Sequence, residues 1–565
     1  MKAIVYQIFT RLYGNRNTTR KQGGTLAENG SGKFADISAS ALKSIRELGI
    51  THVWYTGVIR HATQTDYSAF GIPRQHPAVV KGRAGSPYAI ADYYDVDPDL
   101  AVDVRKRMEE FEKLVKRTHR AGLKVIIDFV PNHVARQYQS ICKPEGTEDL
   151  GANDNDEVDF DAQNNFYYCV GQPFSPGIDL YGDADEPYAE DPAKATGNDQ
   201  FGACPSANDW YETVKLNYGV DYCHGRTPHF NPIPATWRQM RDILLFWSAK
   251  GVDGFRCDMA EMVPTEFWGW VTAQVKQAHP ELIFIGEVYN PSLYRQYLAG
   301  GFDLLYDKVG MYDTMRAVTC GQQSAQSITQ AWQSTDDIRD HMLYFLENHD
   351  EQRLASDFFA GSGEKGIPAL VASVLMRTNP FMLYAGEQYG ERGMDCEGFS
   401  GQDGRTTIFD YWSLDTLCRA SEGKLHKQEQ RLHDIHQRVF HIAHTEKAIS
   451  EGTFFDLMYA NPASDHFYPY SNYVFLRKWQ DELLVVAVNF GTAYADIKVR
   501  IPAHAFNYLE LQEQNVVATD LLNGDQVSFK LRRDGTIGMR IAAHGARVWK
   551  LKTGLQSAAT KTKKK

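Results

Sequence analysis

The chain has 565 residues, of which 43% are hydrophobic, and a formal net charge of −11. One compact core rarely holds a chain of this length, so we expect two or three domains. The acidic balance, without a long basic block, argues against nucleic acid as a partner. No apolar run approaches about 18 residues, so we expect no membrane span.

The N-terminal segment reads MKAIVYQIFTRLYG and leads directly into strand-like sequence, without the apolar centre of a signal peptide. We therefore expect a cytoplasmic protein, or a secreted or periplasmic one if a signal was removed. None of the eight cysteines forms a CxxC pair, which argues against a zinc site. Free thiols are favoured over disulfides in such a chain, although one or two disulfides between residues 142 and 223 are conceivable. The sequence does not indicate an oligomeric state.

Short apolar runs alternate with helix-like stretches through most of the chain. Before the second run, ISASALKSIRELG predicts an amphipathic helix that ends at its glycine, Gly49. Before the third run, Met108, Phe111 and Val115 keep helical spacing, and Gly122 is placed to end the helix. The runs lie at 3–9, 51–58, 123–130, 252–258, 282–288, 302–307, 342–348 and 380–387. Strands alternating with helices in this way predict an α/β fold, the (β/α)8 TIM barrel.

Two segments depart from this alternation. About a hundred residues after the third run lack clear periodicity, and a structureless loop of that length is improbable. We interpret them as an inserted subdomain at 134–232, which divides the barrel into 1–133 and 233–445. From 446 to 555 the sequence alternates as strands do and predicts a C-terminal all-β sandwich. Residues 556–565 are expected to form a disordered tail.

Charged and polar residues gather where four of the predicted strands end. In a parallel barrel the working residues lie at these C-terminal strand ends. They are Asp128, Asn132 and His133 on the third strand, Arg256 and Asp258 on the fourth, Glu287 on the fifth, and Asn348, His349 and Asp350 on the seventh. One such carboxylate is often a helix cap, but four at one rim indicate a site with shifted pKa values.

Paired carboxylates suit the cleavage of a glycosidic bond. One attacks the anomeric carbon and the other protonates the leaving oxygen. A third carboxylate can stabilise the cationic transition state. Arg256 lies two residues before Asp258 on the same face of the strand, so we expect it to keep that carboxylate ionised.

The ordered strings DFVPNH, GFRCD, GEV and ENHD resemble the four signature regions of the α-amylase family of glycoside hydrolases (family 13). The resemblance covers about residues 1–445, and the C-terminal β-domain also resembles that of the family. It implies that Asp258 is the nucleophile, Glu287 the general acid and base, and Asp350 the transition-state stabiliser. Substrate-side roles are implied for Arg256, which orients Asp258, for His133 and His349, which bind the sugar, and for Asp128, a partner of the arginine.

Further positions follow from the same resemblance. The segment SPYAIADYYDVDP makes Tyr88 the expected stacking platform for the sugar. Asn132 corresponds to a frequent calcium ligand, although a structural hydrogen-bonding role fits it equally well. Where many α-amylases carry Lys-His after the nucleophile, this chain has Glu261 and Met262. Where many have Pro-Asp-Leu-Asn, it has VKLN, which makes Asn217 the matching residue.

The resemblance implies a retaining hydrolase that cleaves α-1,4-glucosidic bonds in starch-like glucans or maltooligosaccharides. Calcium is a possible metal, and no organic cofactor is expected. An α-glucosidase or a glucanotransferase of the same family is the alternative, because the motifs do not separate these activities. A non-catalytic glucan-binding homologue is a remote alternative, since such relatives usually lose catalytic carboxylates and this chain has all three.

Overall fold

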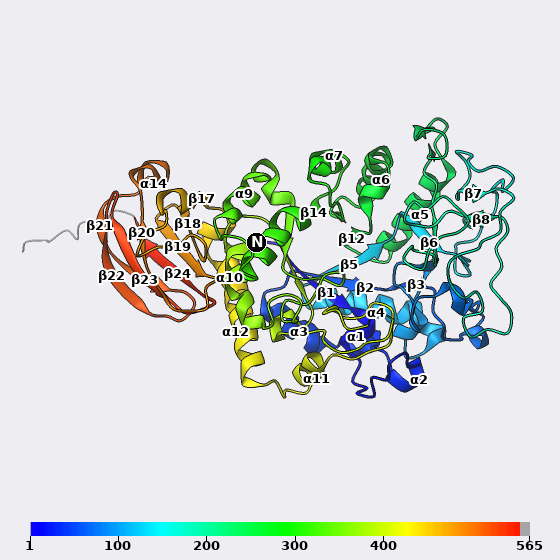
Figure 1. Ribbon diagram of the computed structural model, residues 1–565, viewed down its shortest axis with the longest axis horizontal. Helices are drawn as coiled ribbons and strands as arrows, with labels where there is room; N and C mark the ends of the chain where they lie inside the picture. Colours follow the sequence, from blue (N-terminus) through cyan, green and yellow to red (C-terminus); the bar gives the residue numbers. More distant parts are fainter. Residues whose placement is uncertain (1, 400, 554–565) are drawn as a thin grey trace, which may run out of the picture.

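A computed structural model describes residues 2–399 and 401–553. Its centre is a closed barrel of parallel strands, surrounded by helices (Figure 1). Around the barrel, the strands are β1 (Ile4–Phe9), β16 (Phe381–Tyr384), β15 (Met342–Phe345), β14 (Leu304–Tyr306), β13 (Ile283–Gly286), β12 (Gly254–Cys257), β5 (Lys124–Phe129) and β2 (His52–Thr56). Each lies within one of the eight predicted apolar runs, so the predicted barrel is confirmed.

The barrel closes because its first strand pairs with both its second and its last. Ile4 of β1 lies opposite Phe381 of β16, and Val5 lies opposite His52 of β2. Strand β12 pairs with β5 on one side and β13 on the other, which places Arg256 beside Asp128 and Ile285. The carboxyl ends of the predicted catalytic strands therefore meet at one rim.

Amphipathic helices cover the outside of the barrel. The predicted helix before β2 is α3 (Ala39–Leu48), and Gly49 ends it with φ 104°. The predicted helix before β5 is α4 (Arg107–Arg120), which buries Phe111 and Val115. The other main helices are α5 (Ala235–Ala249), α6 (Thr265–Ala278), α7 (Tyr294–Ala299), α8 (Asp313–Thr319), α9 (Ser327–Gln333), α10 (Ile367–Leu375), α11 (Asp415–Ser421) and α12 (Lys427–Thr445).

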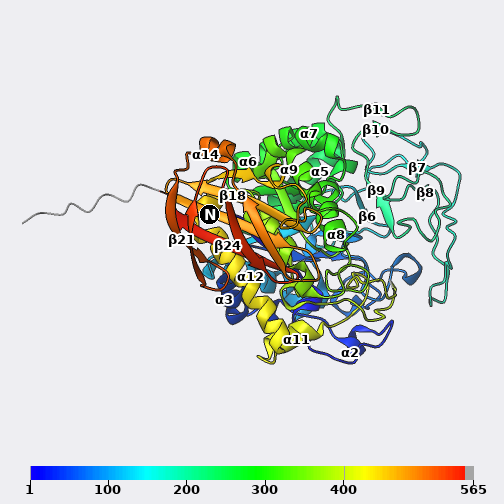
Figure 2. The same ribbon diagram turned by 60° about the vertical axis from the view of Figure 1, so that its left-hand side comes forward.

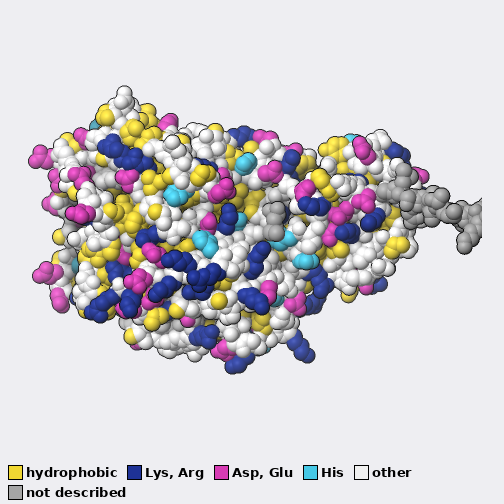
Figure 3. Space-filling model, turned by 180° about the vertical axis from the view of Figure 1, so that it is seen from behind, with side chains coloured by type: hydrophobic (Ala, Val, Ile, Leu, Met, Phe, Trp, Pro, Cys, Tyr) yellow, Lys and Arg dark blue, Asp and Glu magenta, His cyan; other side chains and the backbone are white. Residues whose placement is uncertain are grey.

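The long segment between β5 and α5 forms a body of loops and short antiparallel strand pairs at one end of the molecule (Figures 1 and 2). Its pairs are β6 (His133–Ala135) with β9 (Thr213–Lys215), β7 (Tyr168–Cys169) with β8 (Ala193–Lys194), and β10 (Val220–Asp221) with β11 (Thr227–Pro228). On one face, acidic side chains line the edge of this insert, and Lys and Arg side chains lie over the barrel (Figure 3).

The C-terminal part is an antiparallel β-domain at the opposite end of the molecule (Figure 1). One sheet contains β17 (Thr453–Asp456), β18 (Asn472–Trp479), β19 (Glu482–Asn489), β24 (Gly545–Lys552), β21 (Gln514–Asp520) and β22 (Gln526–Leu531), in this order. A second sheet pairs β20 (Ala495–Arg500) with β23 (Thr536–Ile541). This confirms the predicted β-domain. The predicted tail lies outside the described residues.

A buried arginine joins the β-domain to the barrel. Arg477 on β18 is 1% exposed. It donates hydrogen bonds to the carbonyl of Met376, just after α10, and to those of Ala448, Ile449 and Gly452. The apolar side chains of both parts belong to one continuous core.

All eight cysteines lie in the described ranges and are free thiols, as favoured from the sequence. No helix among the described residues has both the length and the apolar character that a bilayer crossing requires.

Candidate active site

The three candidate catalytic carboxylates meet at the barrel rim. Asp258 follows β12, Glu287 follows β13, and Asp350 lies in the loop after β15. Asp258 and Glu287 are 6% and 3% exposed, whereas the side chain of Asp350 retains 38% exposure. Two of the carboxyls are therefore enclosed in the rim and the third opens toward solvent.

One guanidinium group bridges two of these carboxyls. Arg256 Nη1 lies 2.7 Å from Asp258 Oδ1, and Nη2 lies 2.8 Å from Glu287 Oε2. The arginine is fully buried, and its guanidinium lies 5.2 Å from the ring centre of Trp54 and 5.4 Å from that of Tyr88. Because both nitrogens belong to one rigid, planar group, the two carboxyls face the same small volume.

Asp128 lies at the inner side of this bridge. Its Oδ1 is 3.7 Å from Arg256 Nη1, while its Oδ2 accepts hydrogen bonds from Trp54 Nε1 at 3.1 Å and from the Gly57 amide at 3.3 Å. Burial raises the pKa of Asp128 to about 6, although Arg256 opposes the shift. Asp128 thus contacts Arg256 less closely than Asp258 and Glu287 do.

The crowding of carboxyls in an enclosed site disfavours their ionisation. Burial raises the pKa of Asp258 well above its ordinary value; Arg256 opposes this shift and the Glu287 carboxyl adds to it. The pKa of Asp350 is also raised, by its partial burial and then by the Glu287 charge; its 38% exposed side chain makes the effect of burial weaker than at Asp258. We expected Arg256 to keep Asp258 ionised; its effect has that sign but is smaller than the effect of burial.

Glu287 is held at both of its oxygens. Oε1 accepts a hydrogen bond from the Tyr289 hydroxyl at 2.6 Å, and Oε2 accepts one from the Met259 amide at 2.8 Å. Met259, the residue after the candidate nucleophile, has φ 42° in the left-handed region, which is uncommon for a non-glycine residue. In this conformation the Met259 amide points to Glu287, so the loop after β12 orients the carboxyl that follows β13.

The two predicted sugar-binding histidines are buried and neutral. Burial lowers the pKa of His133 to about 3 and that of His349 well below its ordinary value. His349 Nδ1 lies 2.8 Å from Gln7 Nε2, and its Nε2 contacts the Tyr88 hydroxyl and lies 3.1 Å from Asp350 Oδ2. Both ring nitrogens of His349 therefore have polar partners, and Nε2 lies on the side of Tyr88 and Asp350.

Aromatic rings line both sides of the rim. Tyr88, the predicted stacking platform, stacks on His349 with ring centres 5.3 Å apart. The residue is closely packed, and only 8% of its surface is exposed. Trp210, from the insert, lies 5.2 Å from the ring centre of His133. The insert therefore contributes an aromatic wall to the same rim as the barrel residues.

Comparisons with known proteins identify the family of the chain. A family model described as "Alpha amylase, catalytic domain" matches residues 7–422. The chain belongs to the α-amylase family of glycoside hydrolases.

Curated relatives of this α-amylase family member are distant. The chain is 24% identical over 401 residues to "Alpha-amylase MalA" of Haloarcula japonica, which covers 69% of the chain but only 44% of that relative. It is 21% identical over 523 residues to "Neopullulanase 2" of Thermoactinomyces vulgaris, covering 89% of the chain and 71% of the relative. A solved α-amylase from Geobacillus thermoleovorans, complexed with acarbose, matches with TM-score 0.62 and 19% identity over 97% of this chain and 98% of that one.

The predicted metal position is in contact with a lysine. Asn132 donates from Nδ2 to the Gly197 carbonyl at 2.7 Å, and its Oδ1 accepts a hydrogen bond from Lys215 Nζ. Burial lowers the pKa of Lys215, and the Asp199 carboxylate opposes that shift. The side-chain oxygen that would bind a metal here thus already faces a buried amine.

A second group of potential ligands is also committed to other partners. Asp92, Asp95 and Cys142 place ligand atoms within 4.8 Å of one another. However, Asp92 lies 3.3 Å from Arg60, and Asp95 accepts from Arg107 at 2.7 Å. These charges are balanced by arginines, so the cluster needs no cation.

Two further residues singled out from the sequence have structural roles. Glu261 accepts hydrogen bonds from the amides of Tyr289 and Asn290, each at 3.0 Å. Asn217 is fully buried, donates to the Asp161 carbonyl at 2.8 Å and accepts from the Gly219 amide at 2.8 Å. Glu261 fixes the loop that carries Tyr289, and Asn217 fixes the insert.

The structure adds site residues that we did not single out from the sequence: Gln7, Trp210, Tyr289, Tyr306 and Arg405. Tyr306 accepts from Arg256 Nε at 3.3 Å, and Arg405 Nε donates to the Asp350 carbonyl at 2.6 Å. Of these residues, Tyr289 could have been found from the sequence, because it lies only two residues after Glu287. Trp210 and Arg405 come from loops whose sequence carries no such signal.

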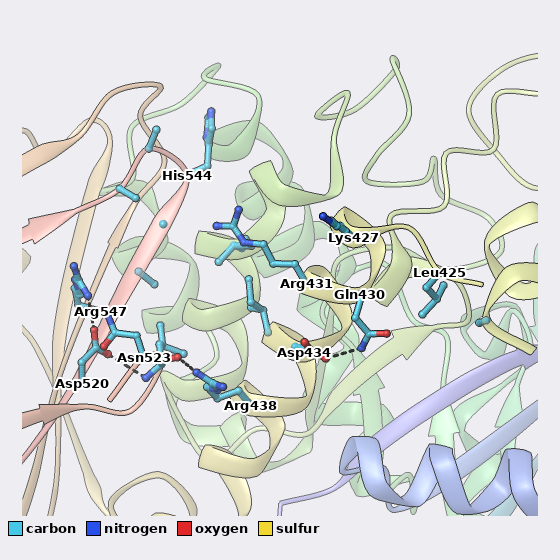
Figure 4. Close-up of a pocket in the computed structure, with 18 of the residues that line it drawn as sticks. Leu425, Lys427, Gln430, Arg431, Asp434, Arg438, Asp520, Asn523, His544 and Arg547 are labelled. Carbon is cyan, nitrogen blue, oxygen red and sulfur yellow. Dashed lines mark hydrogen bonds and ion pairs between the residues drawn. The ribbon is translucent and has the colours of Figure 1, made fainter. Parts of the chain in front are cut away.

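A cavity of about 910 Å³ lies far from this chemistry, between α12 and the C-terminal sheet (Figure 4). Its lining includes Arg438 and Arg547 but none of the candidate site residues. Arg438 donates to the Leu522 carbonyl, and Arg547 lies 2.8 Å from Asp520. We interpret it as a gap between α12 and the C-terminal sheet, across which Arg438 contacts the Leu522 carbonyl.

Proposed function

We propose that this chain is a retaining α-glycoside hydrolase that cleaves α-1,4-glucosidic bonds in starch-like glucans or maltooligosaccharides. The bridge from Arg256 to both Asp258 and Glu287 is the observation that carries the proposal. Retaining glycosidases need two carboxyl groups close enough to act on one bond from its two sides. A shared guanidinium favours that short separation.

In the first step, Glu287 transfers its proton to the glycosidic oxygen while a carboxylate oxygen of Asp258 attacks the anomeric carbon. The bond to the leaving sugar breaks, and a covalent glycosyl ester forms on Asp258. In the second step, Glu287 accepts a proton from water, which attacks the same carbon and releases Asp258. Asp350 faces the positive charge that develops on the sugar ring.

The electrostatics of the site act on the candidate nucleophile. The chemistry requires Asp258 to be ionised when it attacks. Burial raises the pKa of Asp258, and Arg256, whose Nη1 lies 2.7 Å from Asp258 Oδ1, opposes this shift and favours the ionised form. The neutral histidines, His133 and His349, can donate hydrogen bonds to sugar hydroxyls without adding positive charge to a cationic transition state.

The substrate class rests on the family and on what its relatives act on. Solved relatives include an α-amylase complexed with acarbose, and curated ones include an amylase and a neopullulanase. The insert supplies Trp210 beside His133, and stacking on aromatic rings is a common way to hold a sugar. We therefore propose an α-glucan chain lying between the barrel rim and the insert.

The test uses maltoheptaose with wild type, Glu287→Gln and a control, Glu281→Gln, which alters an exposed carboxyl before the same strand. We expect Glu287→Gln to lose at least about 10³-fold in kcat while still binding the sugar, because general acid catalysis contributes 10²–10⁴-fold. The control should match wild type. Near-normal turnover by Glu287→Gln would disprove the assignment.

Product analysis separates the alternatives. NMR of the initial product should show the α anomer, and a β product would overturn retention. Short oligosaccharides alone indicate an endo-acting hydrolase. Glucose released singly indicates an α-glucosidase, and chains longer than maltoheptaose indicate a glucanotransferase. Binding without turnover by the wild type would indicate a non-catalytic homologue.

A further inference from the structure

A buried lysine from the insert lies where the family resemblance places a metal ligand. Lys215 is the last residue of β9 and is 2% exposed. Strand β9 pairs with β6, which places Lys215 directly opposite His133. A long charged side chain is rarely this buried unless it is paired, so its partners indicate its role.

Three oxygen atoms from three separate segments surround the Lys215 amine. They are Asn132 Oδ1 after β5, Asp199 Oδ1 at 2.7 Å from the insert, and the Met262 carbonyl at 3.3 Å from the loop after the candidate nucleophile. The Asn132 and Met262 oxygens accept hydrogen bonds from the amine, and the Asp199 carboxylate adds an ion pair at 2.7 Å. Hydrogen-bond acceptors and a negative charge together suit an ammonium group, which has hydrogens to donate and no acceptor.

The same oxygens do not fit calcium while the lysine is present. Calcium takes six to eight oxygen ligands at about 2.3–2.6 Å. Here the amine occupies the position between the oxygens, and the Asn132 amide is oriented by its bond to the Gly197 carbonyl so that Oδ1 faces Lys215. In the match of VKLN with Pro-Asp-Leu-Asn, Lys215 also stands in place of the aspartate, which reverses the charge at this point.

We propose that the Lys215 ammonium is a permanent internal cation that joins the insert to the loop after Asp258, so that the fold is complete without calcium at Asn132. It links Asp199 of the insert to Met262, four residues after the candidate nucleophile. The position of the insert, with His133 and Trp210, is then set by an ion pair within the chain. This inference does not depend on the proposed reaction.

The first experiment uses the unmodified protein. We expect protein purified in calcium-containing buffer and then dialysed to hold no stoichiometric calcium by elemental analysis. Its unfolding midpoint Tm should be the same with EDTA and with added calcium chloride. Stoichiometric calcium, or a Tm that falls with EDTA, would overturn the proposal.

The second experiment is a double-mutant cycle of Lys215→Met, which keeps the chain length and removes the charge, with Asp199→Asn. We expect Lys215→Met alone to lower Tm by at least about 3 °C, because it leaves a carboxylate without its partner. The double variant should lose less than the sum of the two single losses. Additive losses, or an unchanged Tm for Lys215→Met, would overturn the proposal.

Lys81→Met provides the matched control. Lys81 is also buried, at 7% exposure, and its Nζ lies 2.9 Å from Glu212 of the insert. It should also lower Tm, but additively with Asp199→Asn, because the two residues are not partners. If Lys215→Met does not fold, the calcium content and EDTA response of the wild type still decide the question.

Discussion

Tyr289 donates a hydrogen bond from its hydroxyl to Oε1 of Glu287 over 2.6 Å. Both residues follow β13, and Glu261 holds the backbone of Tyr289 in place. The phenol hydroxyl donates to one carboxyl oxygen and so fixes the direction in which the Glu287 side chain points. Tyr289 is therefore a positioning residue for the candidate acid.

Replacing Tyr289 with Phe should lower kcat by about fivefold, because the Glu287 carboxyl loses a positioning hydrogen bond that contributes on the order of 1 kcal/mol. KM should change little, since the lost contact acts on the candidate acid. Steady-state kinetics on maltoheptaose measures both constants. Tyr294→Phe is the control, because its buried hydroxyl has no hydrogen-bond partner among the described residues. An unchanged kcat in Tyr289→Phe would contradict the assignment.

Replacing Arg256 with Lys should reduce kcat/KM by roughly 10²–10³-fold, because a point charge cannot replace a planar group that contacts two carboxyls at once. The loss should lie mainly in kcat, since Arg256 acts on the reacting groups. Steady-state kinetics measures both constants. Arg295→Lys, at an exposed pair with Asp337, should behave as wild type. A variant with normal kcat would show that the bridge is dispensable.

Replacing Trp210 with Ala should raise KM by roughly tenfold, since an aromatic contact contributes about 1 kcal/mol beyond its buried area. A ring that holds substrate and transition state alike changes KM and leaves kcat nearly unchanged. Kinetics with maltoheptaose separates the two constants. A fall in kcat at constant KM would instead place Trp210 in the chemical step.

Replacing Glu397 with Gln should stabilise the protein, increasingly as pH rises. Glu397 is 2% exposed, and burial raises its pKa from 4.5 to about 8. The folded state thus retains a proton that the unfolded state loses above pH 4.5. Folding consequently becomes less favourable by up to about 1.4 kcal/mol per pH unit between the two pKa values.

Thermal unfolding at two pH values tests this sign. The Tm advantage of Glu397→Gln over wild type should be small near pH 5 and clear near pH 8. Glutamine retains an oxygen that can accept the hydrogen bond from the Thr407 amide. An advantage that shrinks as pH rises would mean that the carboxyl is ionised in the folded protein.

The parts of the fold that could be predicted are those marked by a short sequence pattern, such as an apolar run or a glycine at the end of a helix. Each barrel strand is a short apolar run, and Gly49 and Gly122 both take positive φ where we expected helices to end. The carboxylates at the rim could be located because parallel strands bring all their carboxyl ends to one side. Asp258, Glu287 and Arg256 are joined in this way although two different strands carry them.

Residues in the insert and long loops could not be placed from the sequence. Trp210 and Lys215 reach the rim through turns of the insert whose strands are only two or three residues long. The contacts of Lys215 with Asn132 and Met262 join segments that are distant in the chain. Such contacts follow from the folded path of the loops and leave no periodic pattern.

The attachment of Arg477 to Met376, Ala448, Ile449 and Gly452 has a practical consequence for dissecting the protein. A shortened chain that ended near residue 422, where the family match stops, would lose α12 and the sheet that covers α10. The Met376 carbonyl and the apolar flank of the last barrel helices would then face water. We therefore expect residues 7–422 alone to expose apolar side chains that the whole chain buries, and expression trials should keep α12 and the β-domain with them.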